Sequence, residues 1–270
     1  MPKDAIKTKF SKFIKTKIRS FEEYNDDFSN VLYLINEIYL VRDVAKLKDP
    51  LVSFKSEKTI LDSISNLDIT EKILHYSPTN GFKIARLMKV SKVYYEINEV
   101  TILEFVRTLK KLQKIKGDSL IYIEPKEALK LYKKHCFKED ILDQLKEDTL
   151  IKKLSTDKLE KVISHSFLER TKIKFFENKV KLVDFRYVSF NSPLFDLAYF
   201  SISFNLSEAQ DYYLLSKYFG YKLKIKYSKL LVHYKKYINL LRYYRNCYFY
   251  ALSGEITYLD IKNELKNKIF

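Results

Sequence analysis

Apolar residues at the start of the chain follow a helical spacing. In residues 1–21 they recur every three or four positions, from Ile6 to Phe21, and basic residues occupy many of the positions between them. This pattern predicts a basic amphipathic helix. Its apolar stripe can dock on the rest of the protein, which is the interpretation we favour, or lie on an anionic membrane surface.

Short apolar and β-branched runs separated by turn signals come next. Ser29–Val44 is predicted to form two strands around a turn at Asn36–Glu37, and Ile69–Val90 two strands around Pro78–Gly81. Between these pairs, Lys55–Leu67 has the spacing of a helix. These segments indicate a small lobe made of strands and one helix.

Helical spacing dominates the rest of the chain. It begins at Glu99, is interrupted within Lys161–Phe200 and returns after Leu206. Residues 157–163 are predicted to be the last helical run before the interruption. The interruption itself holds a strand-like run that ends in His165, a loop and a hairpin.

Together the elements predict an α+β fold with two lobes. We expect a basic helix in residues 1–21, a small β-rich N-lobe in 22–90 and a larger, mainly helical C-lobe in 91–270. The boundary between the lobes is placed near Lys89–Lys92.

Composition narrows the choice of partners. The chain has 270 residues, 46% of them hydrophobic, which is enough for a sizeable core. Its net charge of +16 would attract nucleotide, anionic lipid or nucleic acid, although an AT-rich genome alone would produce much of this lysine usage. The sequence contains no RNA-binding motif, so no specific nucleic-acid partner is expected.

Other sequence features favour the cytoplasm. No apolar run approaches the length needed to cross a bilayer, and lysines interrupt the N-terminal segment where a secretory leader would be apolar. The two cysteines, Cys136 and Cys247, fit neither a disulfide framework nor a metal site.

The segment Lys161–Phe200 carries the residues that point to chemistry. It contains the run His165–Leu168, then Asp184 at the end of the hairpin, then Asp196 in the run Phe-Asp-Leu-Ala. This order resembles the catalytic centre of the choline and ethanolamine kinases, relatives of the aminoglycoside phosphotransferases on the protein-kinase-like fold. Their motifs read HNDLxxxN, IDFEY and FDLA. The resemblance, strongest to the bacterial enzymes, extends from about Ser29 to Ser253.

The resemblance implies a catalytic loop that has lost working groups. Phe167 stands where the family has its catalytic Asp, Lys172 where it has a magnesium-binding Asn, and Arg186 where the hairpin motif has a second acid. Phe167 cannot accept a proton, and a cation at a metal site repels magnesium. Asp184 is retained as a metal ligand. Glu169 is a nearby acid that could move into the place of the missing carboxylate.

His165 and Asp196 keep their family positions as well. The resemblance implies that His165 is a structural residue of the loop and that Asp196 organises the loop without taking part in catalysis.

In the N-lobe, the resemblance places Ser29 and Asn30 in the loop that covers nucleotide phosphates, although this loop has no glycine. Arg42 occupies the position of a basic residue that contacts ATP phosphates, and Glu57 that of the acid which orients it. Met88 falls at the hinge, where it would pack on adenine.

In the last helices, Tyr244, Tyr248 and Tyr250 correspond to an aromatic region that helps to hold quaternary ammonium by cation–π contact in the family. The alternative is that these rings belong to the core of a helical lobe.

We therefore expect a choline/ethanolamine-kinase-like protein whose phosphotransfer is impaired, a pseudokinase that can still bind nucleotide. ATP and Mg²⁺ are the cofactors implied, and choline or a similar amino alcohol is the small ligand. One alternative is an active ATP-dependent kinase of choline or another small alcohol with a rebuilt site. Another is a basic peripheral protein that binds anionic membranes through residues 1–21.

Overall fold

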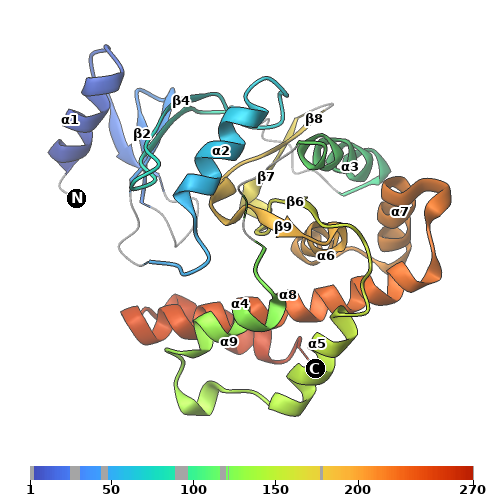
Figure 1. Ribbon diagram of the computed structural model, residues 1–270. Helices are drawn as coiled ribbons and strands as arrows, with labels where there is room; N and C mark the ends of the chain where they lie inside the picture. The colour runs from blue at the N-terminus through green and yellow to red at the C-terminus, as the bar shows by residue number, and fades with distance from the viewer. Residues whose placement is uncertain are drawn as a thin grey trace.

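The computed structural model describes residues 3–24, 31–43, 48–88, 97–115, 120, 122–176 and 179–269. An antiparallel sheet with two helices precedes a mainly helical part, so the predicted α+β, two-part architecture is confirmed (Figure 1). The proposed boundary at Lys89–Lys92 and the loop residues Ser29 and Asn30 lie outside the described residues.

Five antiparallel strands form the N-terminal sheet, in the spatial order β1-β2-β3-β5-β4. They are β1 (Phe21–Glu23), β2 (Leu32–Ile35), β3 (Tyr39–Arg42), β4 (Ile73–Tyr76) and β5 (Lys83–Arg86). The predicted turn between β2 and β3 is present, and its residues Asn36 and Glu37 have φ angles of 54° and 56°. Asparagine tolerates this left-handed conformation well, which suits it to a tight hairpin.

Helix α1 (Lys3–Phe13) is shorter than predicted. The segment after it bonds to the β2–β3 turn instead of continuing the helix: the N–H groups of Arg19 and Ser20 donate to the side-chain oxygen of Asn36, and its amide donates to the carbonyl of Lys17. Tertiary hydrogen bonds thus override the helical spacing beyond Phe13.

The apolar stripe of α1 is docked on the sheet. Ile6 and Phe10 are fully buried, in a cluster formed with the strand residues Tyr33, Ile35, Val41 and Ile84 and with Phe82, which directly precedes β5. The docking interpretation is therefore the one that the structure supports for these two side chains, and they are not on the surface to insert into a membrane.

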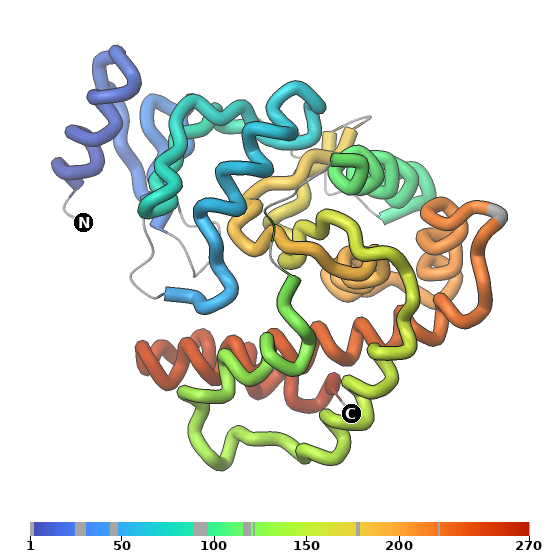
Figure 2. Tube along the Cα trace, in the orientation of Figure 1, coloured from blue at the N-terminus to red at the C-terminus, as the bar shows by residue number. Residues whose placement is uncertain are grey.

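Helices make up most of the second part (Figure 1). Helix α2 (Phe54–Ile64) still belongs to the first part and begins at the N-cap Ser53. The others are α3 (Glu99–Gln113), α4 (Pro125–Lys133), α5 (Gln144–Leu154), α6 (Pro193–Phe204), α7 (Glu208–Phe219), α8 (Ile225–Ser253) and α9 (Ile256–Lys266). Figure 2 shows α8 crossing the helical part, where it packs against α4, α6 and α9.

Two short strand pairs lie between these helices. The predicted hairpin is present as β7 (Ile173–Phe176) and β8 (Lys179–Leu182). Strand β6 (Val162–Ser164) pairs with β9 (Ser189–Asn191), so the helix predicted for 157–163 is wrong. The predicted strand-like run that ends in His165 is confirmed. Its backbone N–H and C=O groups find their partners on β9.

Helix α6 is buried on every side and anchors the larger core. Residues from Pro193 to Ser201 are all buried, which explains a sequence without a polar face. The ring of Phe200 stacks on Phe105 of α3 with centroids 3.9 Å apart. Within the described part of the chain, no helix is both long and apolar enough to cross a membrane.

The docking of α1 can be tested by removing one ring from its buried face. Phe10→Ala should lower the free energy of unfolding by about 3–5 kcal/mol, because it leaves a cavity in the cluster on the sheet. Phe13→Ala is the matched control, since Phe13 is 46% exposed and should cost less. Urea denaturation of both variants measures the difference. Equal losses in the two would contradict the docked position of the helix.

Candidate functional site

A buried ion cluster joins the sheet to the helical part. Arg42, at the end of β3, forms two hydrogen bonds to Glu57 of α2, from Nη1 to Oε1 at 2.9 Å and from Nη2 to Oε2 at 2.7 Å. Nη1 also donates to Oδ1 of Asp184 at 3.1 Å, while Nε and Nη2 donate to the carbonyl oxygen of Gly81 at 3.1 and 2.9 Å. The expected pair between Arg42 and Glu57 is thus present, and all five guanidinium N–H donors are committed.

Gly81 supports this geometry through its backbone. Its φ of 72° is readily adopted by glycine, and a Cβ atom there would lie 2.3 Å from the ring of Phe54. The turn predicted at Pro78–Gly81 therefore does more than connect β4 to β5: it presents the carbonyl that receives two hydrogen bonds from Arg42.

Asp184 lies at the end of the hairpin, buried among three cations. Arg186 donates from Nε to Oδ1 at 2.6 Å and from Nη2 to Oδ2 at 2.8 Å, and Nζ of Lys172 lies 3.1 Å from Oδ2. With Arg42, both carboxylate oxygens are engaged. Burial would raise the pKa of Asp184, but Arg186, Lys172 and Arg42 together hold it well below its ordinary value.

These residues do not fit a magnesium ion. Mg²⁺ requires near-octahedral oxygen ligands, whereas both oxygens of Asp184 face side-chain cations. No group of three His, Cys, Asp or Glu side chains among the described residues could hold a metal. The ion cluster, defined as Arg42, Glu57, Lys172, Asp184 and Arg186, supplies its own positive charge where the resemblance would place the metal.

The loop after β6 is held by Asp196. This side chain, near the start of α6, accepts hydrogen bonds from the backbone N–H groups of His165 at 2.9 Å and Ser166 at 3.0 Å. The His165 ring lies with Nε2 2.9 Å from the carbonyl oxygen of Val183, the residue before Asp184. Since a carbonyl can only accept, Nε2 carries the proton. This geometry is what the predicted loop-organising roles require.

Burial shifts the ionisation of both residues. It lowers the pKa of His165 to about 4, against a smaller opposing effect from the bond to Val183. It raises the pKa of Asp196 to about 6, although the hydrogen bonds from Ser166, Ser164 and His165 act in the opposite direction. At neutral pH, His165 is therefore uncharged and Asp196 is mainly ionised.

Phe167 packs inside an aromatic and ionic group that the sequence interpretation did not identify. Its ring stacks on Tyr187 with centroids 4.3 Å apart, and the guanidinium carbon of Arg245 lies 4.7 Å from its centre. Arg245 donates from Nε to Asp49 at 2.9 Å, and Tyr132 and Tyr187 each donate to Asp49 at 2.8 Å. Phe167 and Asp184 thus belong to one region, linked through the turn that carries Arg186 and Tyr187.

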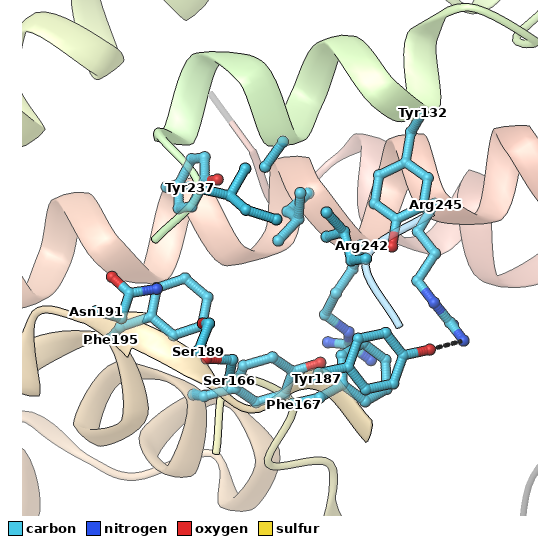
Figure 3. A pocket seen from close by; sticks show the side chains of 15 residues that line it. Tyr132, Ser166, Phe167, Tyr187, Ser189, Asn191, Phe195, Tyr237, Arg242 and Arg245 are labelled. Atoms are coloured by element: carbon cyan, nitrogen blue, oxygen red, sulfur yellow. Dashed lines mark hydrogen bonds between the residues drawn. The ribbon is translucent and has the colours of Figure 1, made fainter. Parts of the chain in front are cut away.

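A cavity of about 60 Å³ adjoins this group (Figure 3). It is enclosed by α4, α6, α8, β9 and the loop that carries Phe167. The residues that line it are Leu51, Ile123, Ala128, Tyr132, Ser166, Phe167, Tyr187, Ser189, Asn191, Phe195, Tyr199, Tyr237, Leu241, Arg242 and Arg245.

The three tyrosines predicted to hold a substrate have partners of their own in the helical part. Tyr244 is fully buried, and its hydroxyl donates to Glu147 and accepts from the N–H of Leu142. Tyr248 donates to the carbonyl of Lys48, and Tyr250 packs against Phe137. None of the three is among the residues that line the cavity, and their role toward a substrate stays a prediction. Another face of α8 lines the cavity, and the four-residue spacing Tyr237, Leu241 and Arg245 was the available signal.

The remaining predicted nucleotide contact is Met88, which follows β5 and is half-buried. The residues after it, 89–96, lie outside the described part, as do Ser29 and Asn30. The nucleotide roles of all three remain predictions.

The burial of His165 predicts a pH-dependent stability. Between pH 6.5 and 4 this ring is protonated in the unfolded chain and neutral in the folded chain. The free energy of unfolding therefore falls as the pH decreases. His165→Gln can keep a donor near Val183 but does not titrate. Between pH 7 and 5 the wild type should lose about 2 kcal/mol more unfolding free energy than the variant.

Urea denaturation at the two pH values measures this difference. His135→Gln, at an exposed histidine, is the matched control and should behave like the wild type. Parallel pH profiles for wild type and His165→Gln would contradict a neutral, buried ring.

Comparison with known proteins identifies the fold through solved structures. No protein-family model matches the chain, and no curated protein matches it by sequence. Among solved structures, it is similar to a choline/ethanolamine kinase family protein from Mesorhizobium loti, with a TM-score of 0.80, 15% identity and coverage of 100% of this chain and 94% of that one.

Two further structures show the same fold. Choline kinase LicA from Streptococcus pneumoniae has a TM-score of 0.81 at 17% identity, covering 98% of both chains. The GDP complex of aminoglycoside 2'-phosphotransferase-IIIa has a TM-score of 0.74 at 13% identity, covering 100% of both. The chain therefore has the kinase-like fold shared by choline kinases and aminoglycoside phosphotransferases.

Proposed function

We propose that this protein is a pseudokinase, a binding protein on the fold of small-molecule phosphotransferases that does not itself transfer phosphate. The observation that carries the proposal is the state of Asp184, whose two carboxylate oxygens are engaged by Arg42, Lys172 and Arg186. Phosphoryl transfer on this kind of fold depends on metal ions that bridge the phosphates.

The second support is the position of Phe167. In the kinases that the sequence resembles, a carboxylate at this position accepts or orients the proton of the attacking hydroxyl. Here a buried ring stacks on Tyr187 under the guanidinium of Arg245. The aromatic ring cannot accept a proton, and general-base assistance is worth about 10²–10⁴-fold in rate.

We propose that nucleotide binding, where it occurs, is independent of magnesium. Structures of the related fold contain AMP in choline kinase LicA and GDP in the aminoglycoside phosphotransferase. In this chain, the ion cluster holds three cations and two carboxylates, and the surplus positive charge favours a polyanion without a metal. A phosphate could reach Arg42 only by displacing a hydrogen bond to Glu57, Asp184 or Gly81.

One observation favours the rival function of an active kinase with a rebuilt site. The charge of the half-buried Glu169 carboxylate raises the pKa of Tyr199 and of Arg245. Both of these residues line the cavity beside Phe167. A carboxylate in this region is a candidate replacement for the missing base. If Glu169 has that role, the wild type will turn over and Glu169→Gln will not.

The proposal predicts no phosphotransfer by the wild type. In a coupled assay for ADP release with choline, ethanolamine and other small alcohols, the rate should not exceed that of a blank. Phe167→Asp alone should not restore activity, because Lys172 and Arg186 still cover Asp184. Wild-type turnover near one per second or above, the range of active kinases, would overturn the proposal.

A triple variant separates loss of groups from loss of scaffold. Phe167→Asp, Lys172→Asn and Arg186→Glu together restore the family's residue types at all three positions. ADP release by this variant alone would show that the fold still supports transfer once the cations are removed.

The same geometry predicts the response to metal. In thermal unfolding with saturating ATP, adding Mg²⁺ should not raise the midpoint further, because the described carboxylate at the centre has no free oxygen. Lys172→Asn with Arg186→Gln is the contrast and should gain a magnesium effect. An added stabilisation by Mg²⁺ in the wild type, absent with ATP alone, would contradict a metal-free site.

A further inference from the structure

The cavity beside Phe167 has the features of a binding site, and its polarity is unlike that of a site for quaternary ammonium. Its inner wall is made of buried rings, among them Tyr132, Tyr187 and Tyr237. Partly exposed polar residues, Ser166 and Asn191 among them, also line it. Apolar walls with a few convergent polar groups are characteristic of small-molecule sites.

Two arginines of α8 face this cavity, and they differ in their partners (Figure 3). Arg245 is bonded to Asp49 and to the hydroxyl of Tyr187. The side chain of Arg242 is half-buried and forms no hydrogen bond or ion pair with any other described residue. It therefore brings an uncommitted, fork-shaped set of donors to the cavity.

A buried hydroxyl completes the polar part of the site. Tyr199, on α6, is one of the residues that line the same cavity, and its buried hydroxyl has no hydrogen-bond partner among the described residues. The charges of Arg242 and Arg245 both lower the pKa of this hydroxyl, against the larger effect of burial. Buried polar groups normally have partners, so an orphaned donor on a residue that lines a cavity points to a ligand that accepts from it.

A cation is poorly accommodated in this place. The ring of Phe167, which lines the cavity, already lies under the guanidinium of Arg245, whose carbon is 4.7 Å from its centre and 4.8 Å from the centre of Phe249. Asp49, the acid bonded to this group, is occupied by Arg245 and two tyrosines.

Two other acids act at longer range. The charge of Glu169 raises the pKa of Tyr199 and of Arg245, and the charge of Arg242 lowers the pKa of Glu264. Neither acid lines the cavity. They leave the direct contacts of a ligand to the arginine, the hydroxyls and the rings.

We propose that this cavity binds a small organic oxyanion, a carboxylate or phosphate monoester with a short apolar body. The anionic group would accept hydrogen bonds from Arg242 and from the Tyr199 hydroxyl, and the apolar body would lie against the aromatic wall. The inference rests on the proposed function, because it names the ligand class of a protein that binds on this fold without transferring phosphate.

Calorimetric titration of the full chain tests the proposal with four probes. Butyrate and n-propyl phosphate carry the two oxyanions, n-propanol is a neutral counterpart and choline is the cation. We expect at least one anion to bind, and to bind more tightly than n-propanol and choline. The better anion identifies the headgroup as carboxylate or phosphate.

Two substitutions locate the binding. Arg242→Gln and Tyr199→Phe should each weaken the anion by about tenfold or more, the usual effect of losing a hydrogen bond to a charged group. Arg107→Gln is the matched control, since it removes the same charge from an exposed position on α3 and should leave the affinity unchanged. The thermal midpoint of Tyr199→Phe should not fall, because its hydroxyl has no partner to lose.

Contrary outcomes are equally specific. Tighter binding of choline than of the anions, equal anion affinity in wild type and Arg242→Gln, or no binding of any probe would each overturn the oxyanion site. Detection of ADP release with the bound anion would overturn the proposed function, while the Arg242-dependent affinity would still support the site.

Discussion

The hydrogen-bonded ion pair between Arg42 and Glu57, extended to Asp184, is the interaction on which the rest of the site depends. It connects strand β3, helix α2 and the end of the β7–β8 hairpin in one buried contact. Removing one partner would leave an uncompensated charge in the interior, which typically costs about 3–5 kcal/mol. Arg42 also donates from Nε and Nη2 to the carbonyl oxygen of Gly81, so the same side chain fixes the turn between β4 and β5.

The same electrostatic demand accounts for the cations that surround Asp184. A buried aspartate needs positive charge, and in this chain Lys172, Arg186 and Arg42 provide it from side chains. A parallel arrangement occurs around Phe167, where Arg245 lies over the rings that could otherwise hold an external cation. In both places a cation of the protein itself lies where an external cation would have to bind, which is the physical basis of our functional proposal.

Local pattern was sufficient for much of the architecture and insufficient where pairing is remote. The β2–β3 and β7–β8 hairpins were predictable because turn residues and alternating runs lie next to each other in the chain. The helix predicted for 157–163 is wrong, since the end of this segment, Val162 and Ile163, is paired with β9 about thirty residues later. Residues 14–20 likewise left the helical pattern because Asn36, on a distant turn, bonds to them.

By itself the sequence determined which residue types stand at the positions that resemble the kinase motifs: Asp184, Asp196, Phe167 and Lys172. It also made the pairing of Arg42 with Glu57 predictable, since their order matches a known arrangement. Only the tertiary structure decided how these groups are used. The three cations meet at Asp184 because β3, the hairpin and the turn after it converge, and the cavity faces Arg242 and Tyr199 because α8 packs across α6. Those contacts depend on helix rotation and packing, which residue order along one chain does not specify.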